Sequence, residues 1–419
     1  MLAAVDSSSK QHARLKVTNM YMLDLAIHIL ANAEVRFQKI DDDFQRANDP
    51  LIYFSSKKEE YFNSFKIRCN GDANITIFAE ILSRKLKTAM HQAVCDKASL
   101  EIVDKMKSDC PAFNGNRSNL ENYILIHLAE KEQFVEFKEY IQKPKQYFEK
   151  YITEGVEEYC SAKENIKIRE IFESCLEFYT GKVSTAITNS ITAVQSNKGD
   201  GSSWLDEFCK QLGDNIHFPR HSLIRADYKD IHDIPCFRYE LATKLETMVA
   251  ELKKEYSTAS IRDIEDVRNK PQDMLREQMS GCWVQCPFCK AICTNTIPGH
   301  DENHRIPIHR PEAVTGGKWC KTDTFSIDIC TSLVASDWWL MLSEDNEIPY
   351  KDYRTAGPKY ASWNITPDLT VQPYWKWFVC RFKSDLERLY KLQFTGRGTI
   401  PEGWTKITKD EAIADLWKK

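Results

Sequence analysis

The stretch CWVQCPFCKAICTNTIPGHDENHRIPIH, residues 282–309, concentrates side chains that bind soft metal ions. Its first twelve positions hold four cysteines, and histidines follow at positions 300, 304 and 309. The other ten cysteines of the chain are spread at wide intervals, which is typical of free thiols that pack as small apolar groups. The local cluster therefore predicts a bound metal ion.

The spacing within the cluster suggests which residues bind the metal. Two cysteines separated by two residues can both reach one Zn²⁺ ion from a tight turn, and Cys286 and Cys289 have that spacing. We predict that His304 and His309 complete the site, while His300 and Cys293 are alternates at equally permitted spacings. Cys320 and Cys330 are further thiols that could displace a histidine.

The residues around the histidines favour a structural metal site. A catalytic zinc keeps one position for water and has a general base nearby, as on an H-E-x-x-H helix. Pro298 and Gly299 precede the histidines, and Pro307 and Pro311 lie on either side of His309, so this segment is expected to be a loop. The surplus of ligands predicts a closed, structural Zn²⁺ site with no catalytic residues.

Nucleic acid and nucleotide binding are disfavoured. A DNA-reading finger needs a helix through its histidines, and the chain has a formal net charge of -4 and a pI near 6.2. A phosphate-binding loop needs G-x-x-x-x-G-K-[S/T], whereas VTGGKWCKT, residues 314–322, lacks that spacing. We expect no nucleotide site and no cofactor other than zinc.

The composition changes near residue 271. Nine of the ten tryptophans and ten of the fifteen prolines lie at or beyond that position. The earlier part is free to form long helices, and the later part is typical of short elements packed around large rings. We predict a helical or linker segment at 1–61, a helical bundle at 62–270 and a Trp-rich, zinc-binding α+β domain at 271–419.

Helical periodicity recurs through the first two thirds of the chain. Apolar residues follow one another at steps of three and four, which places them on one face of a helix. The main stripes are Ile75, Phe78, Leu82, Leu86 and Ala89; Phe134, Phe137 and Ile141; Phe148, Ile152, Val156 and Tyr159; and Ile171, Cys175, Phe178, Val183, Ile187, Ile191 and Val194. The fold class is therefore mainly α, a bundle or stalk followed by the smaller α+β domain.

Two further stretches, around residues 117–121 and at 20–30, give structural predictions. Ser118, with Glu121 three residues on, is expected to cap the helix that follows it. Arg117 is a candidate partner contact, although a structural salt bridge or turn hydrogen bond is the favoured reading. The stretch 20–30 is the most apolar of the chain, but Asp24 and His28 within it predict an amphipathic helix rather than a membrane span.

Several segments together resemble a known family. They are PAFNGNRSNLENYIL (111–125), YIQKPKQYFEKYI (140–152), the Cys/His stretch, FSIDICTSLVAS (325–336), IPYKDYRTAGPKYASWNITPD (348–368) and PYWKWFVCRF (373–382). From about residue 62 to residue 404 the chain resembles the C-terminal region of the interferon-induced very large GTPases. The up-regulator of cell proliferation is a more distant relative.

The resemblance implies an immune-related protein of the cytoplasm, and also of the nucleus, whose G domain lies upstream of the matched region. The family's GTP-binding motifs have no matching positions here, so we expect a fragment of a longer protein or, as the alternative, a shortened paralogue, and no enzyme activity. It implies an interaction or self-association module in innate immunity, with protein partners. The alternatives are a divergent RING-like ubiquitin-ligase adaptor and a nucleic-acid-binding zinc protein.

Overall fold

The computed structural model describes residues 74–161, 166–197, 199–219, 233–258, 270–343 and 346–418, with isolated residues before 74. The predicted segment 1–61 lies almost entirely outside the described residues, as does the stretch 20–30. Within it, β1 (Ala4–Val5) and β2 (Leu15–Lys16) pair antiparallel.

The chain divides into two compact units, each built from two separate stretches of sequence. The first unit comprises Met1–Ala89 and Val183–Met248, and the second comprises Met90–Lys182 and Val249–Lys419. The second unit therefore contains residues from both sides of position 271. Whether the segment after residue 271 folds on its own stays a prediction.

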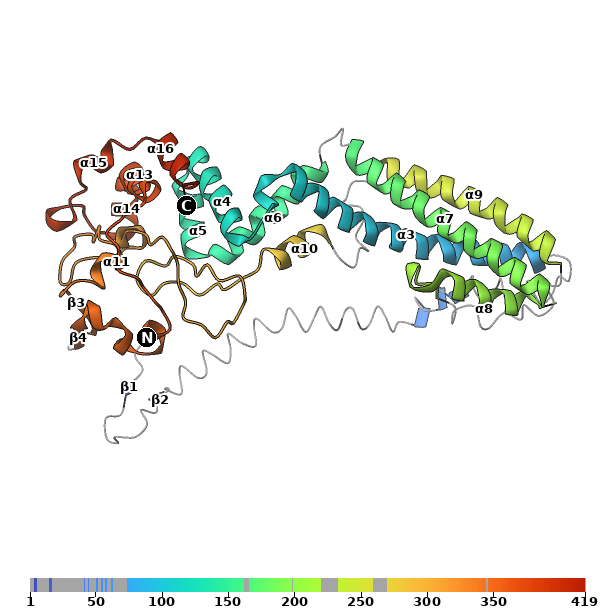
Figure 1. The fold of residues 1–419 in the computed structure, drawn as a ribbon, viewed down its shortest axis with the longest axis horizontal. Coiled ribbons are helices and arrows are strands. Elements are labelled where there is room, and N and C mark those ends of the chain that lie inside the picture. The colour runs from blue at the N-terminus through green and yellow to red at the C-terminus, as the bar shows by residue number, and fades with distance from the viewer. Residues whose placement is uncertain are drawn as a thin grey trace. The chain divides into compact units, whose positions relative to one another are not determined.

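Long helices form the first unit (Figure 1). They are the start of α3 (Asn74–Asp109), the second half of α7 (Ile166–Ser196), α8 (Gly201–Leu212), the 3-10 helix η3 (Gly213–Asn215) and most of α9 (Ile234–Thr258). Phe78 stacks on Phe237 with ring centroids 5.2 Å apart and meets Trp204 edge-on at 6.3 Å. All three rings are fully buried, and burial of each contributes about 2 kcal/mol.

The predicted helical stripes are mostly confirmed by burial. In α3, Phe78, Leu82 and Leu86 are buried, but in α7 the predicted core position Phe178 is 44% exposed. Phe178 follows Cys175 by three residues, a step that turns its side chain back by about 60° around the helix and leaves it beside the buried face rather than on it. The ammonium groups of Lys97 and Lys182 lie 5.0 and 5.5 Å from its ring, so Phe178 makes cation–π contacts instead.

The second unit begins at Met90, inside α3, and includes several shorter helices that precede the Cys/His stretch. They are η2 (Pro111–Phe113), α4 (Arg117–Lys131), α5 (Phe134–Gln142), α6 (Pro144–Ser161) and α10 (Pro271–Gln278). The N-cap of α4 is Asn116, whose side chain accepts from the N–H groups of Ser118 and Asn119 at 3.0 and 3.2 Å. The predicted Ser118 cap is therefore wrong, because the helix begins at Arg117 and Ser118 lies inside its first turn.

Short elements separated by turns make up the rest of the second unit, as the Pro- and Trp-rich composition predicts. The helices are η6 (Glu312–Thr315), α11 (Cys330–Leu333), η7 (Tyr350–Ala356), α12 (Pro358–Ala361), α13 (Pro373–Arg381), α14 (Lys383–Tyr390), η8 (Gly396–Gly398), α15 (Glu402–Thr405) and α16 (Lys409–Asp415). β3 (Trp339–Ser343) and β4 (Asn346–Pro349) form a two-stranded antiparallel sheet. The fold is mainly α with a small α+β part.

Helix α13 connects the C-terminal elements to the earlier helices of the same unit. It packs against α15 and α16, and α16 also packs against α4. Four aromatic side chains of α13 are buried, and the Tyr374 hydroxyl donates to the Leu125 carbonyl at 2.6 Å. The aromatic residues of PYWKWFVCRF are therefore core rather than surface.

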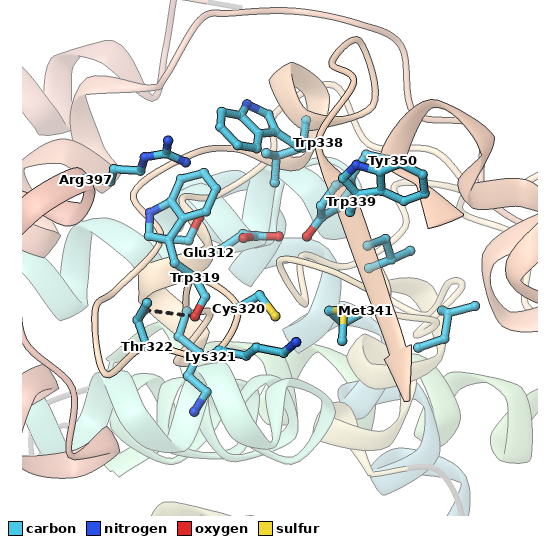
Figure 2. A pocket seen from close by; sticks show the side chains of 15 residues that line it. Glu312, Trp319, Cys320, Lys321, Thr322, Trp338, Trp339, Met341, Tyr350 and Arg397 are labelled. Atoms are coloured by element: carbon cyan, nitrogen blue, oxygen red, sulfur yellow. Dashed lines mark hydrogen bonds between the residues drawn. The ribbon is translucent and has the colours of Figure 1, made fainter. Parts of the chain in front are cut away.

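A cavity of about 1050 Å³ lies beside β3 (Figure 2). One wall is the strand itself, and the segment 318–322 lines another part of the cavity. Glu312 and Tyr350 face each other within it.

Candidate metal centres

The Cys/His stretch begins with a hairpin-like fold over residues 282–295. The N–H groups of Cys282 and Cys293 each donate across its two arms to a carbonyl oxygen 2.9 Å away. Cys286 and Cys289 lie at the tip, where the chain turns. The hairpin therefore holds one pair of cysteines at its base and another at its tip.

The turn at the tip depends on a left-handed residue. Lys290 has φ of 58°, and its N–H donates to the Cys286 carbonyl at 3.1 Å. Pro287 fixes the backbone at the start of the same turn. A tight turn of this kind lets the thiols of Cys286 and Cys289 reach one ion.

The inner cluster consists of Cys286, Cys289, His309 and Cys330, all of which are buried. The Sγ atoms of Cys286 and Cys330 are 3.9 Å apart. The Nδ1 atom of His309 is 3.4 Å from Cys289 Sγ and 2.8 Å from Cys330 Sγ. All four ligand atoms lie within 4.8 Å of one another.

A long-range backbone pairing brings His309 and Cys330 together. Pro311 and Ile329 form an antiparallel bridge, and the Glu312 N–H donates to the Asp328 carbonyl at 2.9 Å. His309, two residues before Pro311, therefore lies beside Cys330, which directly follows Ile329. This pairing places the thiol of Cys330 beside the His309 imidazole.

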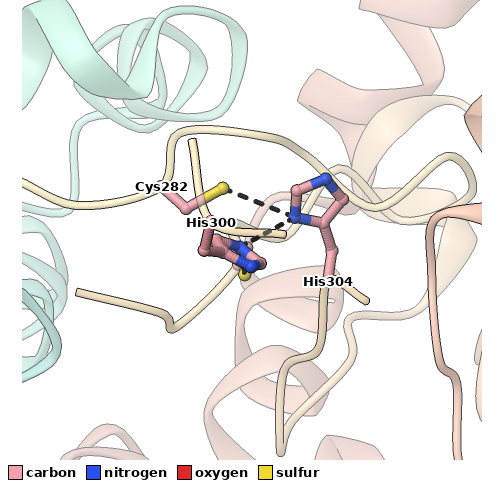
Figure 3. A group of neighbouring side chains, drawn as sticks. Cys282, His300 and His304 are labelled. Carbon is pink, nitrogen blue, oxygen red and sulfur yellow. Dashed lines mark hydrogen bonds between the residues drawn. The ribbon is translucent and has the colours of Figure 1, made fainter. Parts of the chain in front are cut away.

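The outer cluster consists of Cys282, Cys293, His300 and His304, with both cysteines buried and both histidines partly exposed (Figure 3). The Cys282 thiol is 3.5 Å from His304 Nδ1, and the Cys293 thiol is 3.5 Å from His300 Nε2. The two imidazole nitrogens are 3.1 Å apart. As in the inner cluster, the four ligand atoms lie within 4.8 Å of one another.

His304 is held by backbone hydrogen bonds on both of its sides. Its N–H donates to the Ser362 carbonyl at 2.7 Å, and its carbonyl accepts from the Asn364 N–H at 2.9 Å. Its ring lies 5.5 Å from that of Trp363, which is fully buried. The imidazole is therefore positioned by the segment that follows η7 and α12.

These spacings fit tetrahedral zinc. Zinc–sulfur bonds of about 2.3 Å and zinc–nitrogen bonds of about 2.0 Å give ligand–ligand edges of roughly 3.3 to 3.8 Å. The S···S distance of 3.9 Å, three S···N distances of 3.4 to 3.5 Å and the N···N distance of 3.1 Å lie close to that range, whereas the 2.8 Å between Cys330 Sγ and His309 Nδ1 is shorter. Thiolate and imidazole donors are also those that zinc prefers. Each cluster can hold one such ion.

The pKa values of the three inner-cluster thiols are shifted in opposite directions. Burial raises the pKa of the Cys286 thiol and that of the Cys330 thiol well above the ordinary value for cysteine. Burial acts in the same direction on Cys289, but hydrogen bonds from Cys286, Cys330 and His309 hold its pKa well below the ordinary value. Protein groups alone therefore stabilise one thiolate, and a divalent cation would stabilise all three.

In the outer cluster, burial and the neighbouring His300 lower the pKa of His304. Its imidazole is therefore neutral at pH 7, which is the form that binds metal ions.

The structure distributes the predicted ligands between two clusters. Cys286, Cys289 and His309 come together, whereas His304 lies in the outer cluster with the alternates His300 and Cys293. Cys282 and Cys330 complete the two sets. The signal for Cys282 was its place among four cysteines within twelve residues, and Cys330 was one of the further thiols. Cys320 is exposed and belongs to neither cluster.

Arg117 of α4 binds the base of the hairpin. Its guanidinium donates to the carbonyls of Cys282 and Cys293 and lies 4.8 Å from the Trp283 ring. The side chain is 2% exposed, and a Cβ added at Gly281 would lie 3.0 Å from one of its nitrogens. Arg117 therefore has a structural role, as a bridge between α4 and two residues of the outer cluster.

Arg310 makes the corresponding link beside the inner cluster. It directly follows His309, and its guanidinium donates to the Tyr140 hydroxyl at 2.6 Å and to Glu121 at 3.4 Å. It also lies 4.5 Å from the Trp375 ring. Each cluster is thus connected to the helices of the same unit by a buried arginine.

The fold and the two clusters define a class of protein: a helix-rich chain whose C-terminal part contains two Cys/His clusters that could each hold a metal ion. Residues 282–416 match the family model described as "Interferon-induced very large GTPase 1, C-terminal domain". This segment of the chain belongs to that domain family, and the match starts at the first cysteine of the outer cluster and includes all eight cluster residues.

Two curated relatives extend the similarity to nearly the whole chain. Interferon-induced very large GTPase 1 of Mus musculus is 42% identical over 401 residues, which is 96% of this chain and 16% of that protein. The Homo sapiens protein of the same name is 41% identical over 415 residues, 99% of this chain and 17% of the relative. The chain thus spans about one sixth of the length of these relatives. No solved structure matches it.

Among the helices in the described part of the chain, none combines the length and the apolar character needed to cross a membrane.

Proposed function

We propose that this chain is an interaction and self-association module of an interferon-inducible very large GTPase-like protein that acts in the innate immune response. The observation that carries the proposal is the pair of four-ligand clusters, each linked to the helices by a buried arginine. A zinc ion with four protein ligands has no position for water or substrate. This supports a structural role for the metal, in a domain that presents a surface to a partner.

Both ions are proposed to be Zn²⁺. The inner ion is held by Cys286, Cys289, Cys330 and His309 through Nδ1, and the outer ion by Cys282, Cys293, His300 and His304. Bound zinc would supply the cross-links that order these loops, since metal binding to a loop-rich domain contributes directly to its folding.

A RING-like ubiquitin-ligase adaptor is the second candidate, because RING domains also use eight ligands for two zinc ions. RING domains alternate ligand pairs between their two ions along the chain. Here the inner pair Cys286 and Cys289 is nested between Cys282 and Cys293 of the outer cluster. The nested order favours a different type of zinc domain, and the interaction module remains the preferred reading.

No nucleotide chemistry is proposed for this chain. The relatives are named as GTPases, and the stretch aligned with this chain is 16 to 17% of their length. Following the family resemblance, we expect GTP binding in those relatives to reside in a G domain upstream of that stretch. Following the same resemblance, the proposed location is the cytoplasm, with the nucleus as an additional site.

Sedimentation velocity on the full chain, combined with elemental analysis, tests the proposal. The wild type and a matched control, Cys236→Ser, which changes an exposed cysteine outside both clusters, should bind zinc and self-associate as concentration rises. Cys289→Ser should lose zinc and change this association. A wild-type chain that contains no zinc would contradict the metal assignment, and a zinc-loaded chain that stays monomeric at every concentration would contradict self-association.

A further inference from the structure

The cavity beside β3 has the lining of a binding groove. We call it the tryptophan groove, after Trp319, Trp338 and Trp339, which line it together with Leu333, Leu340 and Met341. Trp338 and Trp339 are 45% and 55% exposed, although large aromatic side chains are usually buried. Its volume of about 1050 Å³ could accommodate several residues of a peptide (Figure 2).

The strand along the groove has a free edge. The Tyr350 N–H donates to the Trp338 carbonyl at 2.7 Å, and Trp339 lies opposite Pro349, which has no N–H to give. In an antiparallel pair, residues alternate between facing the partner strand and facing away. The N–H and C=O groups of Trp339 and Met341 therefore point away from β4.

No other backbone segment pairs with that edge in the described part of the chain. β3 and β4 form a sheet of two strands only, and no further backbone hydrogen bond from Trp339 or Met341 is found among the described residues. The groove is lined by consecutive residues of this strand, from 338 to 342. An extended peptide in the groove could therefore pair with β3 as a third strand.

The charges around the groove favour an acidic ligand. Lys318, Lys321 and Arg397 line it, and none of the three has an acidic partner among the described residues. The Arg397 guanidinium lies 4.5 Å from the Trp338 ring and 5.5 Å from the Trp319 ring, which holds its charge at the groove. Glu312 is the one acid of the lining and is only 7% exposed.

We infer that the tryptophan groove binds an extended acidic segment of a partner protein, which pairs with the free edge of β3 and alternates acidic with apolar side chains. This rests on the proposed interaction function and adds to it the surface and the chemistry of the partner. Apolar side chains would pack on the tryptophans, and acidic ones would pair with Lys318, Lys321 and Arg397. Single-stranded nucleic acid is also anionic and stacks on aromatic rings. The free edge favours a peptide, since strand pairing requires alternating N–H and C=O groups.

The test measures fluorescence anisotropy of the full chain with a labelled octapeptide pool that alternates Asp or Glu with Val, Leu or Phe. Met341→Pro removes the outward N–H without affecting the bonds to β4, since that N–H faces away from β4. The double variant Lys318→Glu with Lys321→Glu reverses charge at the groove. Each change should weaken binding by roughly tenfold. Lys383→Glu, an exposed position outside the groove, should bind like the wild type.

Probe-side controls keep the test independent of folding. A pool with methylated backbone nitrogens at alternate positions should bind more weakly to the unaltered chain, and a pool with Lys and Arg in place of the acids should not bind. Equal binding of the methylated pool, no binding of the acidic pool, or tighter binding of an oligouridine that survives Met341→Pro would each overturn the inference. The zinc content of every sample is measured as well, which separates this inference from the proposed function. A chain that contains zinc and self-associates but does not bind the peptides would contradict only the assignment of the groove as a peptide site.

Discussion

The inner and outer clusters are built on one hairpin but differ in donors and exposure. The inner cluster has three sulfurs and one nitrogen, with every ligand residue buried, whereas the outer cluster has two of each and partly exposed histidines. Buried thiolates bind zinc out of reach of water and chelators, while exposed imidazoles can be protonated and released. We propose that the inner cluster contributes more to the stability of the domain than the outer cluster, whose cysteine carbonyls accept from Arg117 of α4.

Loss of the inner cluster should have the largest effect. Cys289→Ser removes the thiol whose pKa the cluster lowers, so the inner zinc should be lost and the region after residue 271 should unfold. We expect a loss of more than about 4 kcal/mol, as for removal of a structural metal. Circular dichroism should show that the long helices α7 and α9 persist. Equal loss of helical signal throughout the chain would contradict the predicted independence of the helices, and Cys236→Ser serves as control.

Loss of the outer cluster should have a smaller effect than loss of the inner one. His300→Ala removes a partly exposed ligand whose partners are Cys293 and His304. The expected result is a chain with one zinc, with the hairpin tip still folded and a stability loss of about 2 kcal/mol. Native mass spectrometry would count the ions. If His300→Ala destabilised the chain as much as Cys289→Ser, the proposed difference in stability contribution between the two clusters would be contradicted.

The contact between Arg117 and the base of the hairpin can be tested without changing a residue of either cluster. Arg117→Ala leaves the carbonyls of Cys282 and Cys293 without their donor and should cost about 2 kcal/mol. Urea unfolding followed by tryptophan fluorescence measures the loss. Arg388→Ala, at a 79% exposed side chain paired with Asp385, is the matched control and should change stability by less than about 1 kcal/mol. Similar results for the two variants would contradict the role of Arg117.

The smallest effect is expected at a contact that involves no metal. Glu132 accepts from Arg381 at 2.7 Å and from Lys409 at 2.8 Å, and these hydrogen bonds lower its pKa from the usual 4.5. A carboxyl group whose pKa is lowered by folding stabilises the folded state at pH values above its usual pKa. This stabilisation is lost as the pH falls through the lowered, folded-state pKa. Glu132→Gln should therefore cost about 1 kcal/mol at pH 7, with the same difference at pH 5. A difference that disappears before pH 5 would show that the ion pairs do not stabilise this contact.

Local patterns in the sequence predicted the helices and the proximity of Cys286 and Cys289. Helical stripes depend on residues three and four apart, so α3, α5, α6 and α7 could be identified from periodicity alone. The knuckle of Cys286 and Cys289 is equally local. Phe178 shows the limit of this reasoning, because its three-residue step from Cys175 fits the helical pattern and yet places its side chain beside the core.

The division of ligands into two clusters could not be predicted from spacing. His304 and His309 are both compatible with Cys286 and Cys289, and the choice depends on backbone contacts with distant segments. His304 is held by pairing with 362–364, while the bridge between Pro311 and Ile329 brings Cys330 to His309. The role of Arg117 likewise depends on a contact across 165 residues.

The most direct test of the two-cluster arrangement is the zinc content of the full chain after native purification, measured by inductively coupled plasma mass spectrometry. Two zinc ions per chain are expected, falling to one in His300→Ala. A single zinc ion in the wild type, or none, would contradict the assignment of the eight residues to two metal centres.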